Sequence, residues 1–235
     1  MKYNTIYEDT FGTIKGSIEN NFSEDFDLSK NYTIELNLEG ILFNGDTFDG
    51  LELQNEDYYT KEQLHRYSFY NYEVFGTKKI IKELTNCKFQ FILQLKIVDK
   101  KSFQIHKLNG NLTVLLGNFS PEEYSVFQYD YSLNEIDHSI MGDSFENLFD
   151  NLKEKIKETH FIKNCYGCNY SDYSPYGSDH FGDMLCFKNS KDKYLKIKNK
   201  ESYFRLLGNQ NPIYVQETHL CDEFEFRKEN IGYRG

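Results

Sequence analysis

Four cysteines in the last third of the chain are the residues whose types and spacing most clearly predict chemistry. Cys165 and Cys168 form a C-x2-C pair, and Cys186 and Cys221 follow later. A C-x2-C turn can aim two thiolates at one point, and a tetrahedral zinc ion then needs two more soft ligands. The spacing therefore predicts a zinc site with these four cysteines as ligands. Such a site is closed and structural: it contributes to folding and leaves no position for water.

The cysteine pattern leaves other readings open. A ribbon built from two knuckles would have a second C-x2-C pair, which this chain lacks. His180 or His219 could replace one cysteine as a zinc ligand. The thiols could also be buried without metal, or form a disulfide. A disulfide is disfavoured, because the first residues contain no apolar signal segment and a reducing compartment is expected. A redox pair is disfavoured too, because Tyr166-Gly167 between the cysteines indicates a turn where such pairs usually open a helix.

Acidic residues in the segment Asp172–Asp183, together with His180, raise the alternative of a metal-dependent hydrolase. Such a group could supply a general base beside an open metal ion. Asp and Ser in a glycine-rich loop more commonly form turns and caps, however. The chain contains none of the motifs GxSxG, GxxxxGK[ST], GxGxxG or HExxH. We therefore expect a non-catalytic protein and name no catalytic residue.

A second alternative rests on the segment Lys188–Lys200, which holds six lysines with Tyr194 among them. Basic segments with interleaved aromatic residues can bind single-stranded nucleic acid. A solvated hairpin with charged flanks explains the same pattern, since Tyr194, Leu195 and Ile197 account for a strand. Nucleic acid is therefore not the expected partner.

The charge of the chain is uneven. Of its 235 residues, 27 are Lys or Arg and 37 are Asp or Glu, for a net charge of −10. Residues 1–160 carry a net charge of −11 and residues 161–235 a net charge of +1. A negative charge of this size affects which partners a protein binds rather than how it folds. It argues against nucleic acid or an anionic membrane as the partner of residues 1–160. No stretch approaches the roughly 18–20 apolar residues of a membrane span.

The composition favours strands. The chain has 19 Tyr, 20 Phe and no Trp, and Ala, the best helix former, is absent. Strand periodicity predicts several strands in residues 1–140, with Asn44-Gly45 and Asn109-Gly110 as hairpin turns. The predicted strands are Tyr32–Phe43, Tyr67–Phe75, Phe89–Val98, Asn111–Leu116 and Tyr124–Tyr131. Residues 57–66 and 77–85 are predicted as short helices.

One longer helix is well signalled. Asp143 is a candidate cap with Glu146 three residues later, and Phe145, Leu148 and Leu152 follow helical spacing. We expect this helix at residues 144–158, packed across the sheet. Beyond it, the runs Met184–Lys188, Tyr194–Lys198 and Ile213–Glu217 are predicted as short strands.

The predicted fold class is thus β-rich α+β. Residues 1–160 form an acidic domain with an antiparallel sheet or sandwich and one packed helix. Residues 161–235 form a small zinc-ribbon-like module docked on it.

The segments CYGCNYSDYSPYGSDHFGDMLCF and ETHLCDEFEFRKENIGYRG resemble those of an uncharacterised bacterial family of unknown function. The resemblance covers mainly residues 164–235. It implies a bacterial source and implies that the four cysteines belong together. It implies no activity.

These observations predict a cytoplasmic binding protein with a structural zinc site and a basic protein partner. One version is an immunity-type protein that neutralises a basic toxin, because charge complementarity speeds association and sets specificity. The sequence does not define the oligomeric state.

Overall fold

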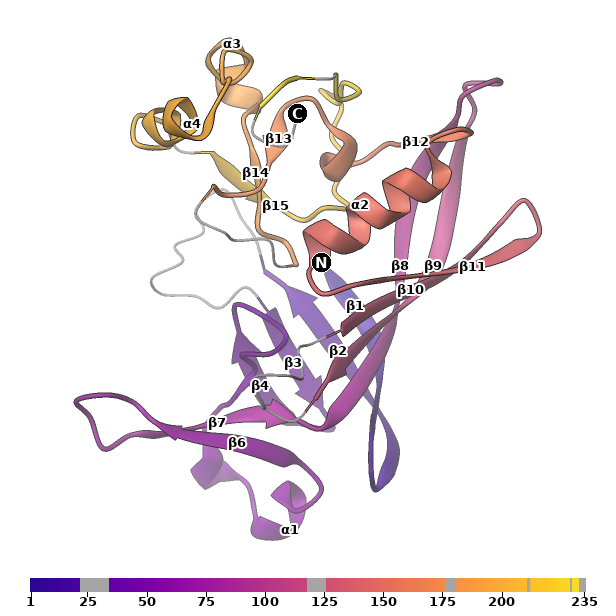
Figure 1. Cartoon of the computed structure of the whole chain (residues 1–235). Coiled ribbons are helices and arrows are strands. Elements are labelled where there is room, and N and C mark those ends of the chain that lie inside the picture. Colours follow the sequence, from indigo (N-terminus) through magenta and orange to yellow (C-terminus); the bar gives the residue numbers. More distant parts are fainter. Residues whose placement is uncertain (22–33, 118–125, 176–180, 211, 229, 233–235) are drawn as a thin grey trace.

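The architecture was obtained as a computed structural model, which describes residues 1–21, 34–117, 126–175, 181–210, 212–228 and 230–232. Within this part, twelve strands form one antiparallel sheet and three short strands form another. Figure 1 shows the large sheet through the lower and middle part of the molecule and the C-terminal elements at the opposite end.

The large sheet has the strand order β11-β10-β9-β8-β1-β2-β3-β4-β5-β7-β6, and β12 pairs with β8 beside this path. Its strands are β1 Lys2–Asp9, β2 Gly12–Asn20, β3 Ile34–Leu38, β4 Ile41–Gly45, β5 Glu52–Leu53, β6 Ser68–Glu73, β7 Ile80–Thr85, β8 Cys87–Asp99, β9 Ile105–Leu116, β10 Val126–Leu133, β11 Ile136–Gly142 and β12 His160–Ile162.

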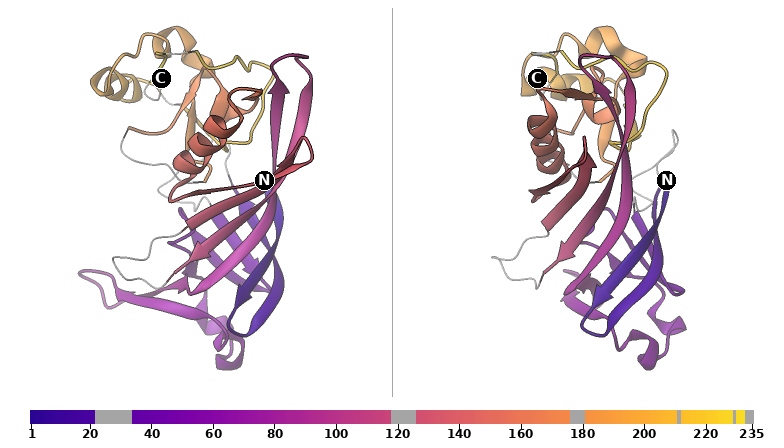
Figure 2. Two further views of the ribbon diagram at one scale, coloured as in Figure 1. Left: turned by 45° about the vertical axis from the view of Figure 1, so that its right-hand side comes forward. Right: turned by 90° about the vertical axis from the view of Figure 1, so that its right-hand side faces the viewer.

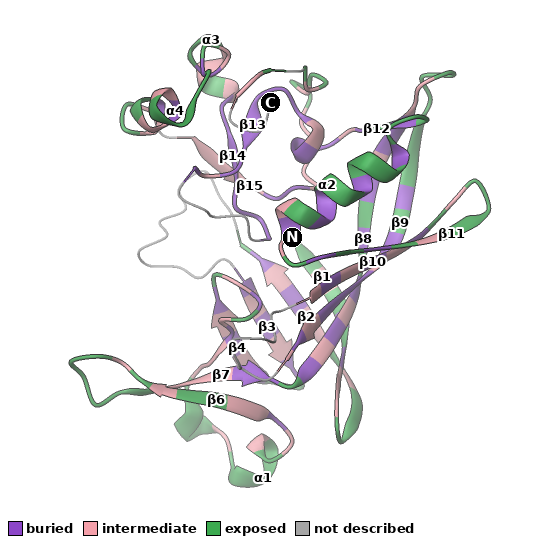
Figure 3. Ribbon diagram, viewed as in Figure 1, coloured by how far each residue is buried: buried purple, intermediate pink, exposed green. Residues whose placement is uncertain are grey.

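Side chains along these strands alternate between a buried and a more exposed face of the sheet, as the sequence predicts. In β8, the side chains of Phe89, Phe91, Leu93, Leu95 and Ile97 are buried, and the residues between them are at least partly exposed. β3 repeats the pattern, with its apolar residues buried and Glu35 and Asn37 on the other face. Figure 3 shows this alternation along the strands. The expected β-rich fold with a large antiparallel sheet and few helices is confirmed.

Helix α2, Phe145–Ile156, packs on the part of the sheet formed by β10, β11 and β12. Its apolar residues are buried as predicted, and Figure 2 shows the helix to one side of the long strands. The predicted cap at Asp143 is wrong, because Ser144 has the extended backbone of a cap and its side chain accepts the N–H of Asn147.

An aromatic cluster joins the loop after β4 to the rest of the core. The ring of Phe48 lies within 6.3 Å, centroid to centroid, of five other phenylalanine rings. These belong to Phe89, Phe91, Phe127, Phe145 and Phe181. Phe181 lies beyond residue 160, so the C-terminal part contributes directly to the main core.

The C-terminal part contains short elements around a second buried cluster, which includes Tyr170, Phe187, Tyr194 and Tyr203. Its small sheet has the order β13-β14-β15. Its elements are η2 Cys165–Gly167, β13 Ser171–Asp172, β14 Met184–Cys186, η3 Lys188–Ser190, α3 Lys191–Tyr194, α4 Lys200–Leu207 and β15 Ile213–Val215. The strands predicted near Met184 and Ile213 are confirmed in shorter form. The strand predicted at Tyr194–Lys198 is wrong, because α3 ends there and Ile197 N–H closes a turn on Tyr194.

Both predicted Asn-Gly turns were also wrong. Asn44 and Gly45 are the last two residues of β4. The turn that divides the predicted strand Tyr32–Phe43 is formed by Glu39-Gly40, both with positive φ, and the first two residues of that prediction lie outside the described residues. Asn109-Gly110 lies inside β9, where a Cβ at Gly110 would come within 2.2 Å of the Tyr129 ring. That glycine serves close packing rather than a turn.

Of the two predicted short helical segments, one is confirmed and the other is wrong. The short helices expected at 57–66 are present as η1 Glu56–Tyr58 and α1 Lys61–Leu64. The helix expected at 77–85 is wrong, because Ile80–Thr85 pairs along β6 as a strand. Among the described residues, no helix is both long enough and apolar enough to span a membrane.

Candidate functional site

Cys165 and Cys168 lie at the two ends of a single tight turn. Cys165 begins η2, and the N–H of Cys168 donates to the carbonyl of Cys165 at 3.0 Å. Gly167 between them fits because a Cβ there would come within 2.1 Å of the Ile162 carbonyl oxygen. The local sequence thus forms the expected turn with both cysteines buried.

Backbone pairing brings the other two cysteines to this turn. Cys186 lies in β14, opposite Ser171 of β13 and Ile213 of β15. The segment that contains Cys221 is held to the turn by a hydrogen bond, in which the N–H of Cys165 donates to the carbonyl of His219 at 2.7 Å. No disulfide joins the described cysteines, and all four are free thiols.

The four thiol groups interact electrostatically in every pairwise combination. Burial is the largest cause that raises the pKa of Cys165, and negative charge on Cys186, Cys168 and Cys221 raises it further. Burial likewise raises the pKa of Cys168 and of Cys186, with contributions from Cys221 to both and from Cys168 to Cys186. Backbone N–H groups act in the opposite direction at Cys168 and Cys186. Without a cation, burial therefore favours the protonated thiols of Cys165, Cys168 and Cys186.

As the side chains lie, no group of three or more His, Cys, Asp or Glu in the described chain could hold a metal ion. The four cysteines are neighbours without forming a coordination sphere. His219 lines a cavity of about 280 Å³ that Cys186 and Cys221 also line, and burial lowers its pKa. His180 lies outside the described residues.

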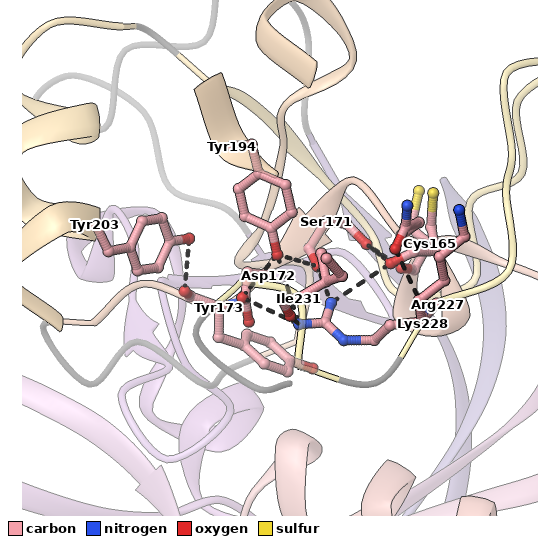
Figure 4. Close-up of polar contacts among 11 residues, drawn as sticks. Cys165, Ser171, Asp172, Tyr173, Tyr194, Tyr203, Arg227, Lys228 and Ile231 are labelled. Atoms are coloured by element: carbon pink, nitrogen blue, oxygen red, sulfur yellow. Dashed lines mark hydrogen bonds and ion pairs between the residues drawn. The ribbon is translucent and has the colours of Figure 1, made fainter. Parts of the chain in front are cut away.

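Asp172 is not an open carboxylate. Its side chain is fully buried, accepts a hydrogen bond from the Tyr194 hydroxyl at 2.8 Å and pairs with Arg227 at 3.3 Å. Figure 4 shows Arg227 beside this carboxylate, and its Nη1 atom donates to the carbonyl groups of Ser171 and Cys168. Asp183 is buried as well, and Asp179 lies outside the described residues. These contacts support a structural role for Asp172.

Glu217 is a buried acid that the sequence did not indicate. Its side chain is fully buried, and its carboxylate accepts hydrogen bonds from the Tyr173 hydroxyl at 2.9 Å and from the Gly182 N–H. Burial raises the pKa of Glu217 to about 8. No local pattern in the sequence around Glu217 separates it from an exposed strand residue.

The segment Lys188–Lys200 forms helical turns rather than the expected hairpin. Lys191 pairs with Glu223 at 2.8 Å and lies over the Tyr170 ring, while the Tyr194 ring is fully buried. The aromatic residue that would stack with a base is therefore part of the core.

A row of carboxylates crosses the outer face of the large sheet. The strand register places Glu19 opposite Glu35, Glu35 opposite Asn44, Asn44 opposite Glu52, and Glu52 opposite Glu83. We call these five residues the acidic row. It runs over β2, β3, β4, β5 and β7, on the face opposite the buried side chains of Ile34 and Leu36.

Few cations balance the acidic row. Glu19 pairs with Lys2 at 3.7 Å, whereas Glu35, Glu52 and Glu83 form no ion pair with described residues. Burial raises the pKa of Glu83, and the charges of Glu52 and Asp49 add to this effect against a hydrogen bond from Tyr72. Like charges placed directly opposite each other on a sheet are destabilising. The fold itself gives no reason for this row.

Comparison with known proteins places the chain in a family. Residues 1–171 match a family of unknown function, DUF6304, and the chain belongs to this family. The match lies mostly before the segments on which the sequence resemblance rested. The chain matches no curated protein and no solved structure.

Proposed function

We propose that this member of the family is a non-catalytic binding protein whose acidic row holds a basic segment of another protein. The row is the observation that carries the proposal. Glu19 and Glu35 form one directly opposite pair and Glu52 and Glu83 another, with Asn44 between the two pairs. The Cβ atoms of directly opposite residues lie about 5 Å apart, and a cationic partner would relieve the repulsion within each pair.

Two neighbouring features suit a protein partner. Tyr70 lies opposite Glu83 on the edge strand β6, is 42% exposed, and its ring lies 6.1 Å from that of Tyr72. Tyrosine is enriched at the energetic centres of interfaces. Within the row, the Oδ1 atom of Asn44 is buried and accepts no hydrogen bond from a described residue. After a small rotation of the Asn44 side chain, a lysine or arginine side chain of the partner would supply the missing donor.

The acidic excess is not all on this face. Exposed carboxylates such as Glu135 and Glu158 lie on other elements. The proposal therefore rests on the row and not on net charge alone. A basic toxin, as in the immunity-type hypothesis, is one partner with the required charge.

The test of this proposal compares two double variants that remove the same charge from different parts of the surface. Fluorescently labelled octalysine serves as the probe, and its binding is measured by anisotropy at low and at moderate salt. The double variant Glu35→Gln/Glu52→Gln should lose at least about tenfold in affinity, with a smaller salt dependence. The control, Glu135→Gln/Glu158→Gln, removes the same charge elsewhere and should lose little. Equal losses in both variants would show a diffuse charge effect and contradict the proposal.

We propose in addition that zinc joins the four cysteines as a structural ion. The support is the convergence of Cys165, Cys168, Cys186 and Cys221 through the backbone pairing described above. Zinc-bound thiolates would accept the backbone N–H groups that already favour ionisation at Cys168 and Cys186. Binding would require the sulfur atoms to move into a tetrahedron by rotation of their side chains.

Elemental analysis of protein purified without a metal-affinity tag tests this second proposal. About one zinc ion per chain is expected, with loss of zinc and of stability in Cys221→Ser. Cys87→Ser is the matched control, because Cys87 is also buried but its thiol interacts with Tyr7 and Asp9 and with none of the other cysteines. Protein without zinc would contradict the proposal, and zinc retained in Cys221→Ser would assign other ligands.

A further inference from the structure

A cavity of about 640 Å³ lies between helix α2, β12 and the segment that follows Phe226. This volume is in the range of small-molecule sites, roughly 300–1,000 Å³. The cavity belongs to neither proposed site, since none of the four cysteines and no residue of the acidic row lines it.

The cavity is basic, although the chain as a whole is acidic. Five of its lining residues are Lys or Arg and two are Asp or Glu. Glu154 pairs with Lys157 at 2.6 Å, whereas Asp150 accepts a hydrogen bond from the neutral Tyr166 hydroxyl and keeps its negative charge. Lys153 and Lys228, in contrast, form no side-chain hydrogen bond or ion pair with described residues. The uncompensated charge is therefore positive, which favours an anionic ligand.

One buried donor adds to this preference. The terminal nitrogens of Arg227 are engaged with Asp172 and with carbonyl groups, but its Nε is buried and donates to no described residue. A buried donor without an acceptor is destabilising. Arg227 lines the cavity, so a ligand oxygen or ring nitrogen there could accept this N–H after a small shift of the side chain.

Two aromatic rings at the cavity are partly exposed. Phe161 and Phe226 are 40% and 39% exposed, and their centroids lie 5.0 Å apart. The Lys100 ammonium lies 4.2 Å from the Phe161 centroid. Exposed rings beside cations form a surface on which a planar heteroaromatic ring can stack.

We propose that this cavity binds a nucleoside phosphate. The base stacks on Phe161 or Phe226, and the phosphate binds Lys153 and Lys228. A ligand with only one of these two parts would contact either the exposed ring faces or the lysine ammonium groups, but not both. The cavity lies between a helix and two chain segments, and its volume is that of a small-molecule site, which favours a single nucleotide over a polymer.

The experiment is a titration by isothermal calorimetry with four probes: AMP, adenosine, ribose 5-phosphate and a dT oligomer. AMP is expected to bind saturably, and each of the two fragments, adenosine and ribose 5-phosphate, at least about tenfold more weakly. Lys153→Ala should weaken AMP binding by about tenfold, and Phe161→Leu by a similar factor. Lys155→Ala is the control, because Lys155 lies on the same helix but does not line the cavity.

Three outcomes of these titrations would overturn the inference. Ribose 5-phosphate binding as tightly as AMP, with no effect of Phe161→Leu, would show a simple anion site. Tighter binding of the dT oligomer than of AMP would assign the surface to nucleic acid. Absence of AMP binding in wild-type protein with a normal unfolding transition would remove the site altogether.

Discussion

The large sheet and the C-terminal part are held together by different kinds of contact. In the sheet, alternate residues of regular strands bury a continuous apolar face, as in β8 and β3. In the C-terminal part, short elements converge on buried polar groups, among them the Asp172–Arg227 pair and Glu217. The first arrangement tolerates an unbalanced outer surface, because its stability comes from the inner face. The C-terminal part depends on particular hydrogen bonds and ion pairs, so substitution of a single polar residue there should change stability more.

The largest expected effect is in the shared aromatic core. Phe48→Ala removes a buried ring that contacts five others and should lower the free energy of unfolding by about 3–5 kcal/mol. Urea unfolding measures this change. The control Phe75→Ala removes a ring that is fully exposed and should change stability little. A loss below about 1 kcal/mol for Phe48→Ala would mean that the loop after β4 does not belong to the core.

The next effect should be confined to the C-terminal part. Arg227→Ala leaves the Asp172 carboxylate buried without its cation, which costs about 3 kcal/mol or more. Hydrogen exchange should show faster exchange in β13, β14 and α3 and near-normal exchange in β2 and β3. Arg205→Ala, which breaks an exposed pair with Glu201, is the control. Uniform loss of protection across the chain would contradict the distinction between the two regions.

Glu217 should make stability fall with increasing pH. Its pKa is raised to about 8 in the folded protein, against 4.5 when unperturbed, so the folded state binds more protons between these values. The contribution is fully present below about pH 4.5 and is lost as the pH rises through 8. Glu217→Gln keeps an acceptor for Tyr173 and should remove this component, whereas Glu158→Gln should not. An unchanged slope in Glu217→Gln, measured by unfolding between pH 5 and 9, would refute this assignment.

The smallest effect concerns the acidic row. Glu35→Gln should stabilise the protein by about 0.2–1 kcal/mol at low salt, because it removes like-charge repulsion across β2 and β3. The gain should shrink as salt is added. Glu39→Gln, in the neighbouring turn, should give a smaller change. Destabilisation by Glu35→Gln would mean that the row contributes to the fold, which would weaken its assignment as a binding surface.

Regular elements could be predicted because their signals are local. The alternation in Phe89–Val98 and the helical spacing of Phe145, Leu148 and Leu152 each reflect burial on one face. The turns were harder to predict, because an Asn-Gly pair can form a hairpin turn in one protein and allow close packing inside a strand in another. Only the position of Tyr129 explains why residue 110 is glycine.

The candidate sites depend on contacts between distant residues. The turn at Cys165–Cys168 could be predicted from its spacing, but the acidic row requires the register of five strands, which a single sequence does not provide. Buried Glu217 and Asp172 could not be distinguished from exposed acids, because their partners Tyr173, Gly182 and Arg227 are recognised only in the folded chain. Zinc binding, the domain boundary at residue 160 and the partner remain predictions.

The most direct test of the central claim is to locate where a basic peptide binds. Backbone amide shifts in NMR spectra of labelled protein, recorded during titration with octalysine, report this position. The account predicts that the largest changes cluster at Glu35, Asn44, Glu52 and Glu83 and at Tyr70 on the adjoining edge strand. Changes concentrated instead on α2 or the turn at Glu135, or spread evenly over all exposed carboxylates, would contradict it.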